Sequence, residues 1–141
     1  MSNVEIEKAL IKHLEERQPF SPRLTVVGPL QAYSPADQET YLRTSYFPNM
    51  TRTRSSAKGG PVQYTGVFQV LVVGPATGSS FELKEIAGVI AEELFHQGAV
   101  VITESGRKVK IYDEAWVAGF LSDPVSPAVP VSVPYSSVRL S

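Results

Sequence analysis

The stretch VQYTGVFQVLVV, residues 62–73, decides the fold class of this chain. Apolar and polar side chains alternate along it, which is the pattern of a β-strand with one face in a hydrophobic core. One position in the inward row is glycine, Gly66, which predicts either a bulge or a close backbone approach. The inward row otherwise consists of Val62, Tyr64, Phe68, Val70 and Val72, and the outward row includes Gln63, Thr65 and Gln69.

The segment before this strand, residues 48–61, is basic and has no apolar periodicity. Its glycines, prolines and small polar residues predict an exposed, mobile loop. Long loops in compact domains tend to be functional, so we interpret Arg52, Arg54 and Lys58 as a contact surface that becomes ordered on assembly. A solvated connector is the alternative interpretation.

Two segments have the apolar spacing of amphipathic helices, residues 3–18 and residues 79–98. Pro19 ends the first segment and Gly98 closes the second. Each begins with an S-x-x-E capping box, in which two side chains bond to the free backbone N–H groups of the first turn. The boxes are Ser2 with Glu5 and Ser79 with Glu82.

Shorter apolar runs complete the expected sheet. Residues 24–27 and 41–47 have the composition of strands, and a Ser-Gly turn joins residues 99–103 to 107–112 as a hairpin. Residues 115–121 are apolar at successive positions, which predicts a central strand that is covered on both faces. These runs, with the long strand and the two helices, indicate an α+β fold.

The C-terminal segment, residues 124–141, combines alternating apolar residues with prolines. Its prolines at 124, 130 and 134 all fall on even positions, so they remove backbone donors along one edge only. This parity predicts an edge strand that either guards the sheet or docks on a neighbouring subunit as an arm. A solvated polyproline tail is the alternative. The residues of the expected arm are Val129, Val131, Val133 and Tyr135.

Length and composition limit the remaining options. The chain has 141 residues, 43% hydrophobic and 19% charged, which fits one globular domain over residues 1–141. Its net charge of −1 gives no overall attraction to nucleic acid or membranes, and the absence of cysteine excludes disulfides and thiolate chemistry. We find no signal-peptide pattern or membrane-spanning run, so a cytoplasmic location at synthesis is expected.

Catalytic and ligand-binding patterns are weak. His13 and His96 fall on the expected helices without a partner nucleophile, so surface positions are expected for both. We interpret Asp113-Glu114 as part of a turn rather than as a metal site. The 74–80 turn joins a strand to a helix as a phosphate loop does, but it has no lysine, and Pro75 removes a donor. We therefore expect no enzyme activity, cofactor or metal, and keep a small nucleotide-binding module as a minor alternative.

The order of these elements resembles the bacteriophage tail terminator-like proteins, and is similar in plan to the U protein of phage lambda. The resemblance covers about residues 3–135 and is most specific in the Y-x-G-x-x-Q-V pattern of Tyr64–Val70, with the Pro-Gly turn that follows. It implies a mixed, largely antiparallel sheet with two amphipathic helices packed on it, as in the α/β sandwich of that family.

The resemblance also implies a structural role in the virion tail after assembly in the host cytoplasm. Family members form a hexameric ring that caps the tail tube, stops its polymerisation and presents a surface to the head connector. Arg52, Arg54 and Lys58 would then face the tube protein, a neighbouring subunit or the DNA that passes through the channel. Another head–tail joining or tube-associated protein of similar fold is the nearest alternative.

Overall fold

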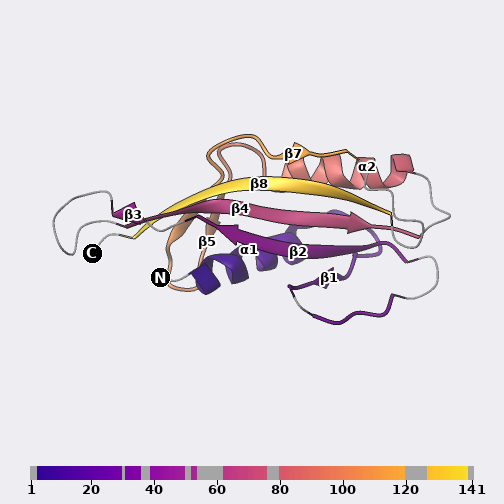
Figure 1. Ribbon diagram of the computed structural model, residues 1–141, viewed down its shortest axis with the longest axis horizontal. Helices are drawn as coiled ribbons and strands as arrows, with labels where there is room; N and C mark the ends of the chain where they lie inside the picture. Colours follow the sequence, from indigo (N-terminus) through magenta and orange to yellow (C-terminus); the bar gives the residue numbers. More distant parts are fainter. Residues whose placement is uncertain are drawn as a thin grey trace.

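The computed structural model describes residues 3–29, 31–35, 39–49, 52–53, 62–75, 80–119 and 127–139. Within these ranges, eight strands form one sheet in the order β1-β2-β4-β8-β6-β5, with β3 paired to β4 and β7 paired to β8 (Figure 1). Only β1 and β2 pair in parallel, so the predicted α+β class with a largely antiparallel sheet is confirmed. The helical elements are α1 (Asn3–Arg17), α2 (Ser80–Val89) and the π-turn η1 (Ile90–Leu94). The strands are β1 (Val26–Val27), β2 (Tyr41–Pro48), β3 (Arg52–Thr53), β4 (Val62–Val73), β5 (Val100–Ile102), β6 (Lys108–Lys110), β7 (Trp116–Val117) and β8 (Ala128–Arg139).

Strand β4 follows the alternation of its sequence: from Tyr64 to Val72, residues at even positions are buried and those at odd positions are only partly buried. It pairs with β2 on one side and along its whole length with β8 on the other. The register passes through Gly66 without a bulge. A Cβ atom on Gly66 would lie 2.4 Å from the Phe47 carbonyl oxygen and 2.6 Å from the Tyr135 hydroxyl. The glycine therefore marks a close approach of neighbouring groups, which was one of the two predicted reasons.

Strand β8 is central, so the prediction of an edge strand in the C-terminal segment is wrong. It lies between β4 on one side and β6 with β7 on the other. Its inward side chains are fully buried in the main core of the same chain, which leaves none of them exposed for an inter-subunit arm. The predicted arm role is therefore corrected for Val129, Val131, Val133 and Tyr135.

The even positions of the prolines nevertheless determine which edge of β8 lacks backbone donors. Pro127 accepts a hydrogen bond from Gly74 N–H at 3.0 Å on the β4 side, and Pro130 accepts one from Ala118 N–H at 2.9 Å on the β7 side. Backbone groups alternate between the two edges of a strand, so Pro130 and Pro134 lack their donors on the side of β6 and β7. On that side the described pairing involves only four residues of β8, whereas β4 pairs with twelve.

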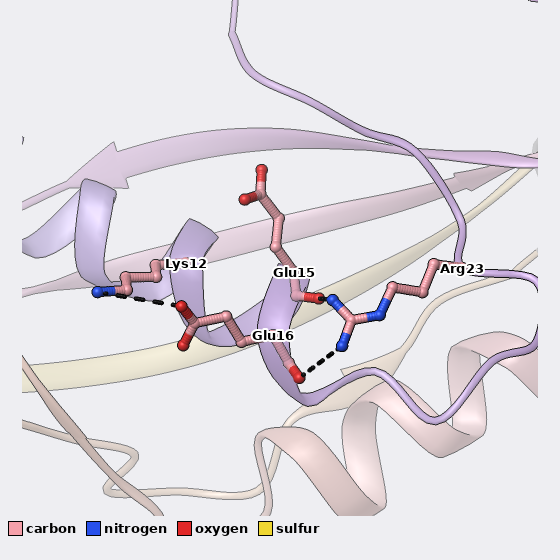
Figure 2. Close-up of polar contacts among 4 residues, drawn as sticks. All are labelled: Lys12, Glu15, Glu16 and Arg23. Atoms are coloured by element: carbon pink, nitrogen blue, oxygen red, sulfur yellow. Dashed lines mark hydrogen bonds and ion pairs between the residues drawn. The ribbon is translucent and has the colours of Figure 1, made fainter.

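Both helices pack on the inward face of the sheet, as predicted, and share its main core. Helix α1 contacts β1 and β5, the strands at the two ends of the sheet, so the sheet curls around this helix. Figure 2 shows how the chain ends α1: the Arg23 guanidinium donates to the carbonyls of Glu15 (3.0 Å) and Glu16 (3.4 Å), while Lys12 lies 4.0 Å from the Glu16 carboxylate. A cation at these carbonyls suits the negative end of the helix dipole.

The prediction of a central strand over residues 115–121 is also wrong. Only Trp116 and Val117 form a strand among the described residues of this segment, and both are exposed, at 51% and 40%. Among the described helices, none is long and apolar enough to cross a bilayer.

Candidate assembly surface

The predicted basic residues are only partly covered by the described structure. The backbone of Arg52 lies in β3, where it pairs with Gln63 of β4. Arg54 and Lys58 lie outside the described residues. The contact role of these three residues stays a prediction.

His13 is not the surface histidine that was expected. Its Nε2 lies 2.8 Å from the Leu94 carbonyl oxygen, and its ring centroid is 5.2 Å from that of Phe95. Burial lowers the pKa of His13, and the hydrogen bond to Leu94 opposes this effect. The side chain therefore ties the end of α1 to the end of the π-turn as a neutral group. His96 is exposed, as predicted.

Neither alternative ligand site gains support from the described residues. Gly74 N–H is already used by the Pro127 carbonyl, and the next four residues after Pro75 lie outside the described ranges. The chain bends at Asp113, whose side-chain oxygen accepts the Glu114 backbone N–H at 2.8 Å. In the part of the chain that the structure describes, no three His, Cys, Asp or Glu side chains are grouped to hold a metal.

The most distinctive surface is a groove that follows the line between α1 and β5. One hollow of about 250 Å³ is lined by the first turns of α1 and by Ile102, Thr103 and Glu104. A second, more open hollow of about 590 Å³ continues past His13 and Arg17 to Val100 and the end of the π-turn. The two hollows run along one side of the helix, because their α1 residues recur at intervals of four. We call this surface the α1–β5 groove.

One end of the groove is fixed by a polar contact between the helix and the β5–β6 hairpin. The carboxylate of Glu5 accepts hydrogen bonds from the Ser105 hydroxyl and from the Ser105 backbone N–H, the latter at 3.1 Å. The Ser105 hydroxyl bond holds the pKa of Glu5 below its ordinary value. Glu5 was predicted as a capping-box residue; its partner Ser2 lies outside the described residues.

The wall that β5 contributes is an open sheet edge. The Ala99 carbonyl accepts a hydrogen bond from Ile111 N–H and Thr103 N–H donates to the Arg107 carbonyl, at 2.9 Å each, so both residues face the side of β6. By alternation, the N–H and C=O groups of Val100 and Ile102 face the opposite edge. No described strand pairs with that edge. The side chains of the same two residues are 46% and 56% exposed.

A family model described as "Phage tail terminator protein" matches residues 5–135. The chain belongs to this family. A solved protein structure supports the assignment at the level of the fold: it is 27% identical, with a TM-score of 0.78 over 100% of this chain and 98% of its own. No curated protein matches the sequence.

Membership of the tail terminator family has direct consequences. It is a structural family, so surfaces that contact other proteins, rather than catalytic side chains, are the functional features to look for. It also assigns the chain to the phage tail. Similarity to the U protein of phage lambda stays a prediction.

Sequence reasoning found the longer strands of this tail terminator, β2, β4 and β8, but not β3, and it missed the groove. The sequence places two apolar residues, Val100 and Ile102, in the outward row of the hairpin strand, and no charge or proline protects them. That row was the available signal of an open edge.

Proposed function

We propose that this protein caps the phage tail tube as a ring, stops tube polymerisation and provides the surface for joining the tail to the head. The observation that carries the proposal is the match to the tail terminator family over residues 5–135, together with the likeness of the whole fold to a solved structure. We further propose a homo-oligomer, expected to be a hexamer, which lies at the head-proximal end of the tail.

The fold suits a binding role. The main core is built within one chain, so a subunit can fold before it meets its partners. Several large apolar side chains are nevertheless exposed, among them Trp116 and Ile102. Apolar groups on the surface of a folded subunit are what an assembling protein needs for contacts with other subunits.

The proposed partners are the tail tube protein on one side of the ring and the head connector on the other. The basic segment, residues 48–61, would contact the tube, a neighbouring subunit or the DNA in the channel through Arg52, Arg54 and Lys58. Their cationic side chains suit either acidic protein surfaces or phosphates.

The proposal is tested by adding the purified protein to polymerising tube protein. We expect tubes to stop growing and to carry one ring at one end in electron micrographs. Tubes that continue to grow with the protein bound along their sides would indicate another tube-associated role. Binding to the head connector without any effect on tube growth would favour a separate joining protein.

A further inference from the structure

The α1–β5 groove has the chemical features of a site for an extended peptide segment. Its β5 wall presents the backbone N–H and C=O groups of Val100 and Ile102, with which none of the described strands pairs. A segment that pairs with this edge would add one strand to the sheet, which is a common mode of peptide recognition. Helix α1 forms the other wall and would cover one face of the added strand.

The chain leaves this edge unprotected, although it protects another. Exposed strand edges invite pairing, and proteins block them with prolines or charges. On the incompletely paired edge of β8, Pro130 and Pro134 remove donors. Strand β5 has the sequence Val-Val-Ile, without proline or charge. An unprotected edge of this kind is expected where pairing with another chain is part of the assembly.

A suitable partner segment is exposed on the same chain. Residues 112–117, with the sequence YDEAWV, lead from β6 into β7, which pairs with β8. Tyr112, Trp116 and Val117 are exposed at 48%, 51% and 40%, and the two acidic residues between them are also exposed. We call residues 112–117 the exposed edge segment.

The two surfaces complement each other in polarity and charge. Six of the eight large apolar side chains that are exposed in the described residues lie on them. Lys8 and Lys12 line the groove together with Glu5, which is bonded to Ser105, and Glu104, so the lysines are the cations available to the acidic Asp113 and Glu114 of the segment. The six apolar residues are Val4, Val100 and Ile102 at the groove and Tyr112, Trp116 and Val117 on the segment.

The far end of the exposed edge segment, β7, lies apart from α1 in one subunit, whereas its beginning is close to the end of the groove, because Tyr112 follows Ile111, whose N–H donates to the Ala99 carbonyl. In Figure 1, β7 lies along the top of the molecule, while α1 lies below the long strands β8, β4 and β2. Two different surfaces on one subunit make a heterologous contact, and such a contact closes into a ring when the rotation between subunits permits. The groove of each subunit would hold the segment of the next.

We propose that the α1–β5 groove binds the exposed edge segment of a second copy of this chain, which pairs with β5 and places its acidic residues beside Lys8 and Lys12. This proposal depends on the ring of the proposed function and identifies the contact between neighbouring subunits of that ring.

Cysteine cross-linking tests this contact directly, because the natural chain has no cysteine. Ile102→Cys mixed with Trp116→Cys should form disulfide-linked dimers under mild oxidation, and the double variant should form a ladder of linked subunits. Val117→Cys is a second position if Trp116→Cys folds poorly. The matched control is Ile102→Cys mixed with Phe81→Cys, since Phe81 is a large exposed side chain on α2, at 71%; this pair should stay unlinked.

Charge exchange gives an independent readout. Lys8→Glu with Lys12→Glu should reduce oligomer formation at least tenfold in native mass spectrometry, and so should Asp113→Lys with Glu114→Lys. A mixture of the two charge-reversed proteins should restore mixed oligomers. The single tryptophan, Trp116, adds a signal in the natural protein: its emission should shift to shorter wavelength as oligomers form.

The outcomes separate this inference from the proposed function. Rings that form without the Ile102–Trp116 cross-link and with unchanged tryptophan emission would overturn the groove contact and leave the tube cap intact. If neither the purified protein nor protein bound to tube ends forms oligomers, both proposals fail. Cross-linking as frequent in the control pair as in the test pair would show random collision and also overturn the contact.

Discussion

The replacement Gly66→Ala tests how closely β2, β4 and β8 approach at one point of the sheet. The added Cβ would lie 2.4 Å from the Phe47 carbonyl oxygen, 2.6 Å from the Tyr135 hydroxyl and 2.9 Å from Pro48 Cα. Two of these three atoms belong to the backbone of β2, which pairs with β4 at this position. Relief of the clash requires both the end of β2 and the buried Tyr135 side chain to shift relative to β4.

The expected loss of stability follows from two opposing effects. Overpacking of a well-packed interior costs about 1–3 kcal/mol, and the upper half applies here because backbone atoms are involved. Replacing glycine by alanine also restricts the unfolded chain, which recovers about 0.4–1 kcal/mol. We therefore expect Gly66→Ala to lower the free energy of unfolding by about 2 kcal/mol.

Urea unfolding measures this difference, with Gly88→Ala as the matched control. A Cβ on Gly88 would meet nothing within 4 Å, and the residue lies inside α2. This replacement should raise stability by about 1 kcal/mol, since alanine favours a helix over glycine. If Gly66→Ala is as stable as the natural chain, with an unchanged urea dependence, the close approach described here is refuted.

Tyr135→Phe provides a second check on the same contact. The Tyr135 hydroxyl is buried and makes no hydrogen bond of normal geometry with a described residue; its polar neighbour is the Tyr46 hydroxyl, which donates to Asn3 Oδ1 at 2.8 Å. Removing an unpaired buried hydroxyl should cost little or stabilise the fold. Combined with Gly66→Ala, it should recover part of the lost stability, because one of the three clashing atoms is gone.

Three further predictions concern pH and assembly. Burial lowers the pKa of His13 below its unfolded value of 6.5, so the unfolded chain binds the proton first and thermal stability should fall between about pH 7 and pH 5. His13→Gln should make the melting temperature less dependent on pH in this range. An equal pH dependence in the natural protein and the variant would contradict the prediction. Ser105→Ala removes the hydroxyl that donates to Glu5 and lowers its pKa. The Glu5 carboxylate stabilises the fold above its unfolded pKa of 4.5, and this stabilisation is lost as the pH falls. Urea midpoints should therefore drop slightly near neutral pH, and the difference should vanish in acid. A triple variant with glutamate in place of Arg52, Arg54 and Lys58 should keep the melting temperature of the natural protein and yield fewer completed particles in a complementation assay. Normal particle yields would indicate that the segment is only a connector.

The local pattern of apolar and polar residues was sufficient to predict much of the fold. The alternation of β4, the two helical segments and the hairpin were predicted because each depends on side-chain spacing within one short stretch. Gly66 was recognised for the same reason, since a glycine in an apolar row is visible in the sequence. The neighbours that crowd it belong to β2 and β8 and are known only from the folded chain.

The errors came from relations between distant segments. The prolines of β8 correctly indicated an edge with missing donors, but Pro130 and Pro134 cannot reveal that β6 and β7 cover part of that edge. Trp116 and Val117 were expected inside a sheet because they are apolar, and their exposure depends on the position of β7. The bond of His13 to Leu94 joins residues 81 positions apart, which no local pattern predicts.

The central claim is that the protein ends tube growth, and electron microscopy of tails assembled without it is the most direct test. Our account predicts overlong tubes of variable length that do not join heads, with normal length restored when the protein is supplied. Tails of normal, uniform length in its absence would contradict the account.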